Sequence, residues 1–123
     1  MGLDMYIIRK NEQGKDVELA YWRKANQIRA WLVRHNIIED DDNCYDRPIT
    51  MQNLRDLVDD CEKVLINHDL AKEILPTSMG FFFGSTEYDD WYYYDLIKTI
   101  VMLQPIIDNP KYDNETLLYY DWY

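Results

Sequence analysis

The chain opens with a short apolar segment followed by a polar turn. Residues Leu3 to Ile8 are apolar or aromatic, interrupted only by Asp4, and Asn11 to Asp16 are polar and include Gly14. Short runs of this kind, bounded by turn residues, are typical of β-strands. We therefore expect a short strand over residues 3–8.

From Val17 to about Asn36 the apolar positions follow a helical spacing. At about 100° per residue one side of such a helix is apolar, and the opposite side holds polar and basic residues. The apolar side consists of Tyr21, Ala25, Ile28 and Leu32. The pattern predicts an amphipathic helix over residues 17–36, with Tyr21 in the core.

The middle of the chain predicts a loop and two helices. Residues Glu39 to Pro48 are charged and end in proline, which is typical of a solvent-exposed loop. Thr50 is a good N-cap, with Asn53 at the capping-box position of the helix that follows. The apolar stripe of that helix is Leu54, Leu57, Val58, Cys61, Val64 and Leu65. A short second helix is expected over residues 69–75, ending before Pro76.

The stretch GFFFGSTEYDDWYYYDL, residues 80–96, is dense in aromatic rings and carboxylates. We expect Phe81 to Phe83 to be extended. A helix should begin near Glu87, with Thr86 as its cap and Asp89 in a charged first turn, and end near Leu103 before Pro105. Its predicted inward residues are Tyr92, Leu96, Ile100 and Leu103, flanked by Tyr93 and Ile97. Its predicted outward residues are Trp91, Tyr94, Asp95, Lys98 and Met102.

The segment ETLLYYDWY at residues 115–123 is aromatic and loosely alternating, which favours a strand with Leu118, Tyr120 and Trp122 on one side. Its simplest partner is the first strand. The sequence therefore predicts an α+β fold: one mainly helical domain over residues 1–123, with three to four helices and a small antiparallel sheet that pairs the N- and C-terminal strands.

Charge is distributed unevenly along the chain. The 123 residues carry a formal net charge of −10, while the region 17–36 is locally basic. Its charged residues are Arg23, Lys24, Arg29 and Arg34 against Glu18. An acidic surface repels nucleic-acid phosphates and attracts basic surfaces. We therefore expect a protein partner with a basic surface rather than direct binding of nucleic acid, although acidity also serves solubility alone.

Several functional classes lack sequence support. No run of eighteen apolar residues and no secretion signal is present, so we expect neither a membrane span nor export, and a cytoplasmic location. Cys44 and Cys61 lack metal-site spacing, as do His35 and His68. No phosphate-binding glycine loop, GxSxG or HExxH motif occurs. We predict no cofactor, metal or catalytic residue, and an enzyme of unknown class is the weakest of three hypotheses. The oligomeric state stays open.

The first hypothesis is protein docking. Large rings beside carboxylates on an outward helix face are typical of a protein-binding surface, since the rings supply contact area and the acids steer a basic partner. The alternative is that another segment covers these rings. The candidate partner-binding residues are Trp91, Tyr94, Asp95, Glu39 and Asp41.

The second hypothesis is a small anionic aromatic ligand such as a nucleotide, held where the 17–36 helix meets residues 81–91. The candidate ligand-binding residues are Tyr21, Trp22, Arg23, Asn26 and Arg29. Arg29 lies at the border of the predicted apolar face, so it needs a negative partner. We expect an internal carboxylate, with Asp4, Asp89 and Asp90 as candidates, rather than a bound anion.

Three segments carry a resemblance to a known family. The start MGLDMYI, the segment AYWRKANQI and the segment LPTSMGFFFGSTEYDDWYYYDL together resemble a family of small uncharacterised proteins encoded by phages and bacterial prophages. The resemblance covers about a third of the chain. The docking hypothesis then expects a host protein of a defence system or a nucleic-acid-handling enzyme as the partner. The resemblance itself implies a phage-linked protein in the bacterial cytoplasm. It implies no catalytic residue.

Overall fold

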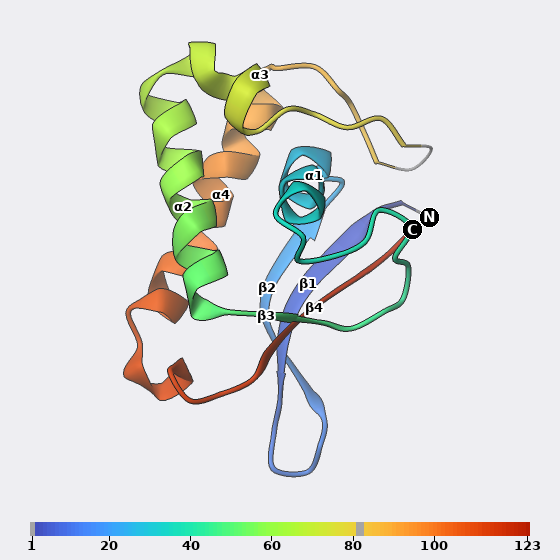
Figure 1. The fold of residues 1–123 in the computed structure, drawn as a ribbon, viewed down its shortest axis with the longest axis vertical. Helices are drawn as coiled ribbons and strands as arrows, with labels where there is room; N and C mark the ends of the chain where they lie inside the picture. The colour runs from blue at the N-terminus through green and yellow to red at the C-terminus, as the bar shows by residue number, and fades with distance from the viewer. Residues whose placement is uncertain (1, 81–82) are drawn as a thin grey trace.

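The protein is built on a four-stranded antiparallel sheet with strand order β2-β1-β4-β3 (Figure 1). The computed structural model describes residues 2–80 and 83–123. The strands are β1 (Asp4–Lys10), β2 (Asp16–Arg23), β3 (Arg47–Ile49) and β4 (Leu117–Trp122). The pairing of the first strand with the last, predicted from the sequence, is confirmed, with Asp4 opposite Trp122 and Arg9 opposite Leu117.

The helices are α1 (Asn26–Arg34), α2 (Met51–Ile66), α3 (Ala71–Ile74) and α4 (Asp90–Ile107), and short 3-10 turns span His68–Leu70 and Pro110–Tyr112. Figure 1 shows α2 and α4 running side by side along one flank of the sheet, with the β1–β2 hairpin extending away from the helices. The predicted α+β fold is confirmed.

The alternation of side chains along each strand separates two faces of the sheet. One face is buried against the helices and contributes Met5, Ile7, Trp22, Leu117 and Tyr119 to the core. The opposite, outer face carries Tyr6, Tyr21, Tyr120 and Trp122. The prediction that Leu118, Tyr120 and Trp122 share one side of the last strand is consistent with this alternation.

The predicted helix over 17–36 is wrong in its first half, which forms β2. The Asn11 side chain accepts hydrogen bonds from the backbone N–H groups of Gln13 and Lys15, both at 2.9 Å. This turn directs the chain back along β1, whose open edge then pairs with β2. Tyr21 therefore lies on the outer sheet face, because residues in a strand alternate. Helix α1 begins only at Asn26.

Three boundaries also differ from the sequence prediction. Helix α4 begins at Asp90, because Asp89 is the N-cap and accepts a hydrogen bond from Tyr92 N at 3.1 Å. It continues through Pro105 to Ile107. The last residues of the predicted loop 39–48 belong to β3, which pairs with β4.

Other local predictions are confirmed. Thr50 and Asn53 form a capping box at the start of α2, with side-chain to backbone distances of 3.0 and 2.9 Å. The short helix expected before Pro76 is present as the 3-10 turn and α3. Phe83 is buried, whereas the prediction for Phe81 and Phe82 falls outside the described residues.

Candidate functional site

Helix α4 is apolar on two opposite sides, but only one side is buried. Its inner side packs in the core through Tyr92, Leu96, Thr99, Leu103 and Ile106. Its outer side exposes Trp91 (77%), Tyr94 (56%), Ile97 (49%) and Val101 (66%). Residues three and four apart lie on the same side of a helix, so these four form one continuous stripe. We call them the α4 stripe.

The sequence predicted half of this stripe. Trp91 and Tyr94 point outward as expected, with their rings 6.4 Å apart in a T-shaped arrangement. Ile97 was expected beside the inward residues and is instead exposed, because the core side of α4 is filled by Leu96 and Thr99. Val101 was not predicted. Its spacing of seven residues from Tyr94 was the signal that could have identified it.

Asp95 differs from its predicted position on the solvent side. It is partly buried and accepts a hydrogen bond from Gln27 Nε2 at 3.3 Å. Burial raises the pKa of Asp95, and the Gln27 hydrogen bond and the nearby Lys98 oppose that rise. The exposed carboxylates at this end of α4 are Glu87, Asp89 and Asp90. The stripe therefore ends in an acidic patch.

A cleft of about 320 Å³ adjoins the start of α4. One wall comes from the β2–α1 turn, with Arg23, Lys24 and Gln27, and the other includes Trp91 and Asp95. Arg23 donates a hydrogen bond to Asp4 at 3.0 Å. Two cations, Arg23 and Lys24, and three carboxylates, Glu87, Asp89 and Asp95, line the cleft, so its charges largely balance.

The Asn26 side chain joins the two segments that line this cleft. Its Nδ2 donates to the carbonyl oxygens of Phe83 and Ser85, at 3.1 and 2.8 Å, and its Oδ1 accepts from Ser78 N at 3.0 Å. Gly84 has φ +88°, and a Cβ at this position would lie 3.0 Å from Lys24 Cβ. The Asn26 side chain therefore holds residues 78–85 against the start of α1 through hydrogen bonds. The close approach of the backbone at Gly84 requires glycine.

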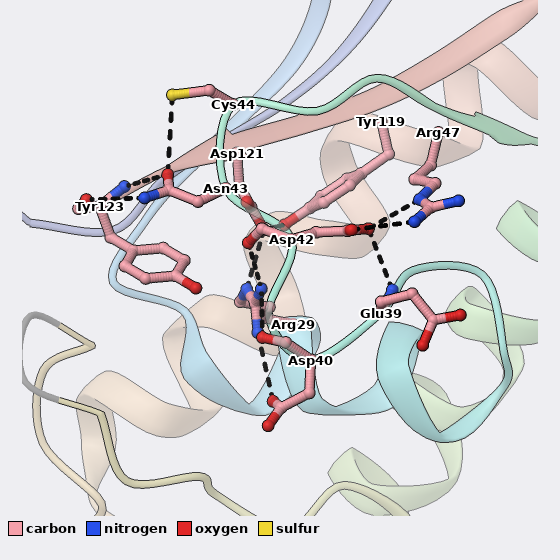
Figure 2. Close-up of polar contacts among 10 residues, drawn as sticks. All are labelled: Arg29, Glu39, Asp40, Asp42, Asn43, Cys44, Arg47, Tyr119, Asp121 and Tyr123. Carbon is pink, nitrogen blue, oxygen red and sulfur yellow. Dashed lines mark hydrogen bonds and ion pairs between the residues drawn. The ribbon is translucent and has the colours of Figure 1, made fainter.

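Arg29 has an internal partner, as expected, but none of the three carboxylates proposed from the sequence. Its Nε donates to Asp121 Oδ2 at 2.8 Å, and its Nη2 donates to the carbonyl oxygens of Asp40 and Asp42 at 3.0 and 2.9 Å (Figure 2). Tyr119 O–H also donates to Asp121 Oδ2, at 2.7 Å. Burial raises the pKa of Asp121, while Tyr119 and Arg29 favour the ionised form.

Aromatic rings complete the environment of Arg29. Its guanidinium carbon lies 5.2 Å from the ring centres of both Phe83 and Tyr123, and the residue is 1% exposed. This enclosure leaves Arg29 no surface for a bound anion.

The loop between α1 and β3 is held in place by hydrogen bonds to Asp42. It carries the two other predicted docking residues, Glu39 and Asp41. Arg47 Nε and Nη2 donate to the Asp42 carboxylate at 2.7 and 2.9 Å (Figure 2), and Arg47 lowers the pKa of Asp42. Glu39 and Asp41 are exposed on this loop. They do not belong to the α4 stripe.

The five residues of the ligand hypothesis do not surround one cavity. Tyr21 lies on the outer sheet face, whereas Trp22 is 1% exposed in the core and donates from Nε1 to Thr99 Oγ1 at 2.8 Å. Asn26 and Arg29 are committed to internal contacts, and Arg23 alone of the five lines the cleft beside α4. The predicted helix placed all five on one element, and the strand that replaces its first half separates them.

Comparison with protein-family models, with curated proteins and with solved structures found no match to this chain. Across residues 2–80 and 83–123, no group of histidine, cysteine and carboxylate side chains has the arrangement of a metal site. In that same part of the chain no helix combines the length and apolar character needed to cross a membrane.

Proposed function

We propose that the protein binds a partner protein through the α4 stripe. The observation that carries this proposal is a helix with two apolar sides, of which one is left in solvent. A surface helix of a single folded domain normally has one apolar side, and a helix that is apolar all round is normally buried. Trp91 and Tyr94 are also the residue types that dominate binding energy at protein interfaces.

The charges around the stripe favour a partner with a basic rim. Glu87, Asp89 and Asp90 stand at its N-terminal end, and the protein as a whole carries a formal charge of −10. Acidic groups beside an apolar contact steer a basic surface and oppose an acidic one. This chemistry supports a partner whose own ligand is a nucleic acid, with the acidic protein imitating its phosphates.

The resemblance to phage and prophage proteins supports a more specific version of this proposal. In that version the partner is a bacterial host protein, belonging to a defence system or handling nucleic acid, and the protein is its inhibitor. The α4 stripe does not depend on this version, because any partner with a complementary apolar surface would cover it.

The test compares Trp91→Ala/Tyr94→Ala with the parent. A partner isolated from the bacterial host is purified, and its affinity for each protein is measured by calorimetry. We expect the double variant to bind at least about 100-fold more weakly, as truncation of two hot-spot residues does, while its Tm stays within a few degrees. The control is Ile66→Ala, which removes another exposed apolar side chain, 87% exposed at the end of α2.

Two results would contradict the proposal. Unchanged affinity of the double variant would place the interface elsewhere, and a large fall in Tm would show that the two rings stabilise the fold. Sedimentation of the protein alone tests whether it forms a dimer. A concentration-dependent dimer that the double variant does not form would show that the α4 stripe binds a second copy of the protein.

The electrostatic version has its own experiment. If acids imitate phosphates, affinity for the purified partner falls steeply with added salt, and Glu39→Lys/Asp41→Lys weakens binding. Affinity that is insensitive to both changes would reject mimicry while leaving docking through α4 in place.

A further inference from the structure

The outer face of the sheet holds a second feature, on different elements from the α4 stripe. A cavity of about 270 Å³ opens there, lined by Tyr6, Ile8, Asp16, Glu18, Tyr120 and Trp122. Strands β1, β2 and β4 each contribute two of these residues. We call this cavity the outer-face cage.

The strand register explains why these side chains meet. Tyr6 pairs with Tyr120, Ile8 pairs with Glu18, and Trp122 lies two residues along β4 from Tyr120. Alternate residues of neighbouring antiparallel strands share one face, so the side chains converge on the side away from the helices. Ile8 is 6% exposed and provides the apolar floor.

Three aromatic side chains, Tyr6, Tyr120 and Trp122, line the cavity together with Ile8. The ring centres of Tyr6 and Tyr120 are 6.1 Å apart with the planes inclined at 45°, and Trp122 is 50% exposed. Tyr21 supports Tyr6 from the next strand, at 5.1 Å between ring centres. Inclined rings around a small space present several negatively polarised faces to one bound group.

The charges at the cage are acidic. Asp16 and Glu18 line it, and no cationic side chain of the described residues does. The Glu18 side chain makes no hydrogen bond or ion pair with any residue that the structure describes. Asp46 stands close enough to interact electrostatically with Tyr120. Two cations lie at the margin: Lys10 pairs with Asp16, and Lys98 Nζ is 5.5 Å from the centre of the Tyr21 ring.

This combination selects one class of ligand. The carboxylates repel an anion. A neutral apolar group would have no favourable electrostatic interaction with the Glu18 carboxylate beside it. An organic cation gains from both the ring faces and the carboxylates, and aromatic cages bind alkylated ammonium groups in this way. We propose that the outer-face cage binds an alkylammonium group, carried either by a free quaternary amine or by a lysine side chain of a peptide.

The volume agrees with this class. Pockets for drug-sized molecules begin at about 300 Å³, so a cavity of about 270 Å³ suits a single compact head group. Lys10 pairs with Asp16 at the wall of the cavity, whereas Lys98 lies over Tyr21, which does not line it, so Glu18 is the lining carboxylate left for a bound cation.

The experiment is a titration of the isotope-labelled protein followed by NMR, with the indole N–H of Trp122 as the reporter. Choline is the first probe, and 3,3-dimethyl-1-butanol, its neutral isostere, is the matched control. We expect a saturable shift with choline in the millimolar range and a response at least about tenfold weaker with the isostere, since only the cation interacts with ring faces and carboxylates. N-acetyl-lysine methylamide and its ε-trimethylated form are titrated in parallel, and the probe bound most tightly identifies the source of the ammonium group.

Variants locate the binding. We expect Trp122→Leu and Tyr120→Leu each to weaken binding of the preferred probe at least about fivefold, with amide shifts as the reporter in the first case. Glu18→Gln changes only a charge on an exposed side chain, so it tests the cage even if a ring variant fails to fold, and it should weaken binding measurably. Trp91→Leu removes the exposed indole of the α4 stripe and should leave binding unchanged.

Three results would overturn the proposal. They are no saturable shift with any of the cations, an equal response to choline and its neutral isostere, or unchanged affinity in Glu18→Gln. Because the probes are small molecules that act on the sheet, these outcomes are independent of whether α4 docks on a protein.

Discussion

Arg29 Nε donates a hydrogen bond to Asp121 Oδ2 at 2.8 Å, and both side chains are 2% exposed. The two residues are 92 positions apart in the chain. The pair fastens α1 to β4 across the buried side of the sheet, and the Asp40 and Asp42 carbonyl oxygens satisfy the remaining part of the guanidinium. A cation enclosed so completely is stable only while its partners are present.

Replacing Arg29 by Ala should therefore destabilise the fold by about 3–5 kcal/mol, the usual effect of leaving one buried charge without its partner. Urea denaturation measures this change. Arg55→Ala, at an exposed position on α2, is the control and should stay within about 0.5 kcal/mol of the parent. A panel of nucleotides should leave the parent Tm unchanged, and an Arg29-dependent rise would contradict the internal role.

Asp95 makes stability depend on pH. Burial raises its pKa above the ordinary value of 3.8, so near and above that value the folded chain binds more protons at this group than the unfolded chain does. The free energy of unfolding contributed by Asp95 therefore falls as pH rises from about 3.8 through the raised pKa.

Asp95→Asn keeps an oxygen that can accept from Gln27 and removes the titration. The variant should be more stable than the parent at pH 7, with the difference shrinking as pH is lowered toward 4. Denaturant melts across that range measure the difference. A stability difference that is constant with pH would show that ionisation of Asp95 is not its source.

The start of α4 offers a matched pair of substitutions. Asp89→Ala removes the side chain that accepts from Tyr92 N and should cost about 1 kcal/mol of stability, as loss of an N-cap does. Thr86→Ala changes an exposed residue that lies outside the cap and should change stability by less than about 0.5 kcal/mol. If thermal denaturation gave the larger effect for Thr86→Ala, the helix boundary would be misplaced.

The two thiols should differ sharply in reactivity. Cys44 is exposed, whereas Cys61 is fully buried in α2, and burial raises the pKa of the Cys61 thiol. Because the thiolate is the reactive species, a thiol reagent should modify one cysteine per native chain quickly and the second only on unfolding. Cys44→Ser should remove the fast phase, and fast labelling of that variant would show that Cys61 is accessible.

The sequence predicted elements well where one local signal dominates. The Thr50 side chain and the single apolar stripe behind it identify α2, and the alternating C-terminal segment identifies β4. Residues 17–23 were misread because Tyr21 fits a helical stripe and a strand equally well over so short a stretch. The hairpin turn at Asn11 and the open edge of β1 decide between them, and pairing between strands is a tertiary effect.

The candidate site was predictable only in part, for a related reason. Trp91 and Tyr94 were assigned to the surface because the helical period of α4 is clear. The partner of Arg29 was expected to be an internal carboxylate, but Asp121 was not identified. It lies 92 residues away, in a strand whose sequence is mostly aromatic. The outer-face cage could likewise not be predicted from the sequence, since it depends on the register of three strands.

The position of β4 also bears on synthesis of the protein by the ribosome. In the sheet β4 lies between β1 and β3, and within residues 2–80 and 83–123 β3 pairs with β4 alone. While residues 117–122 are still in the exit tunnel, the β1–β2 hairpin is the only strand pairing of this sheet that a nascent chain can form. One edge of β1 is then open, and Arg29 lacks its partner Asp121. An open edge invites pairing with other chains, so translation that stalls before Leu117 should release a product that aggregates or is degraded rather than a partly active domain.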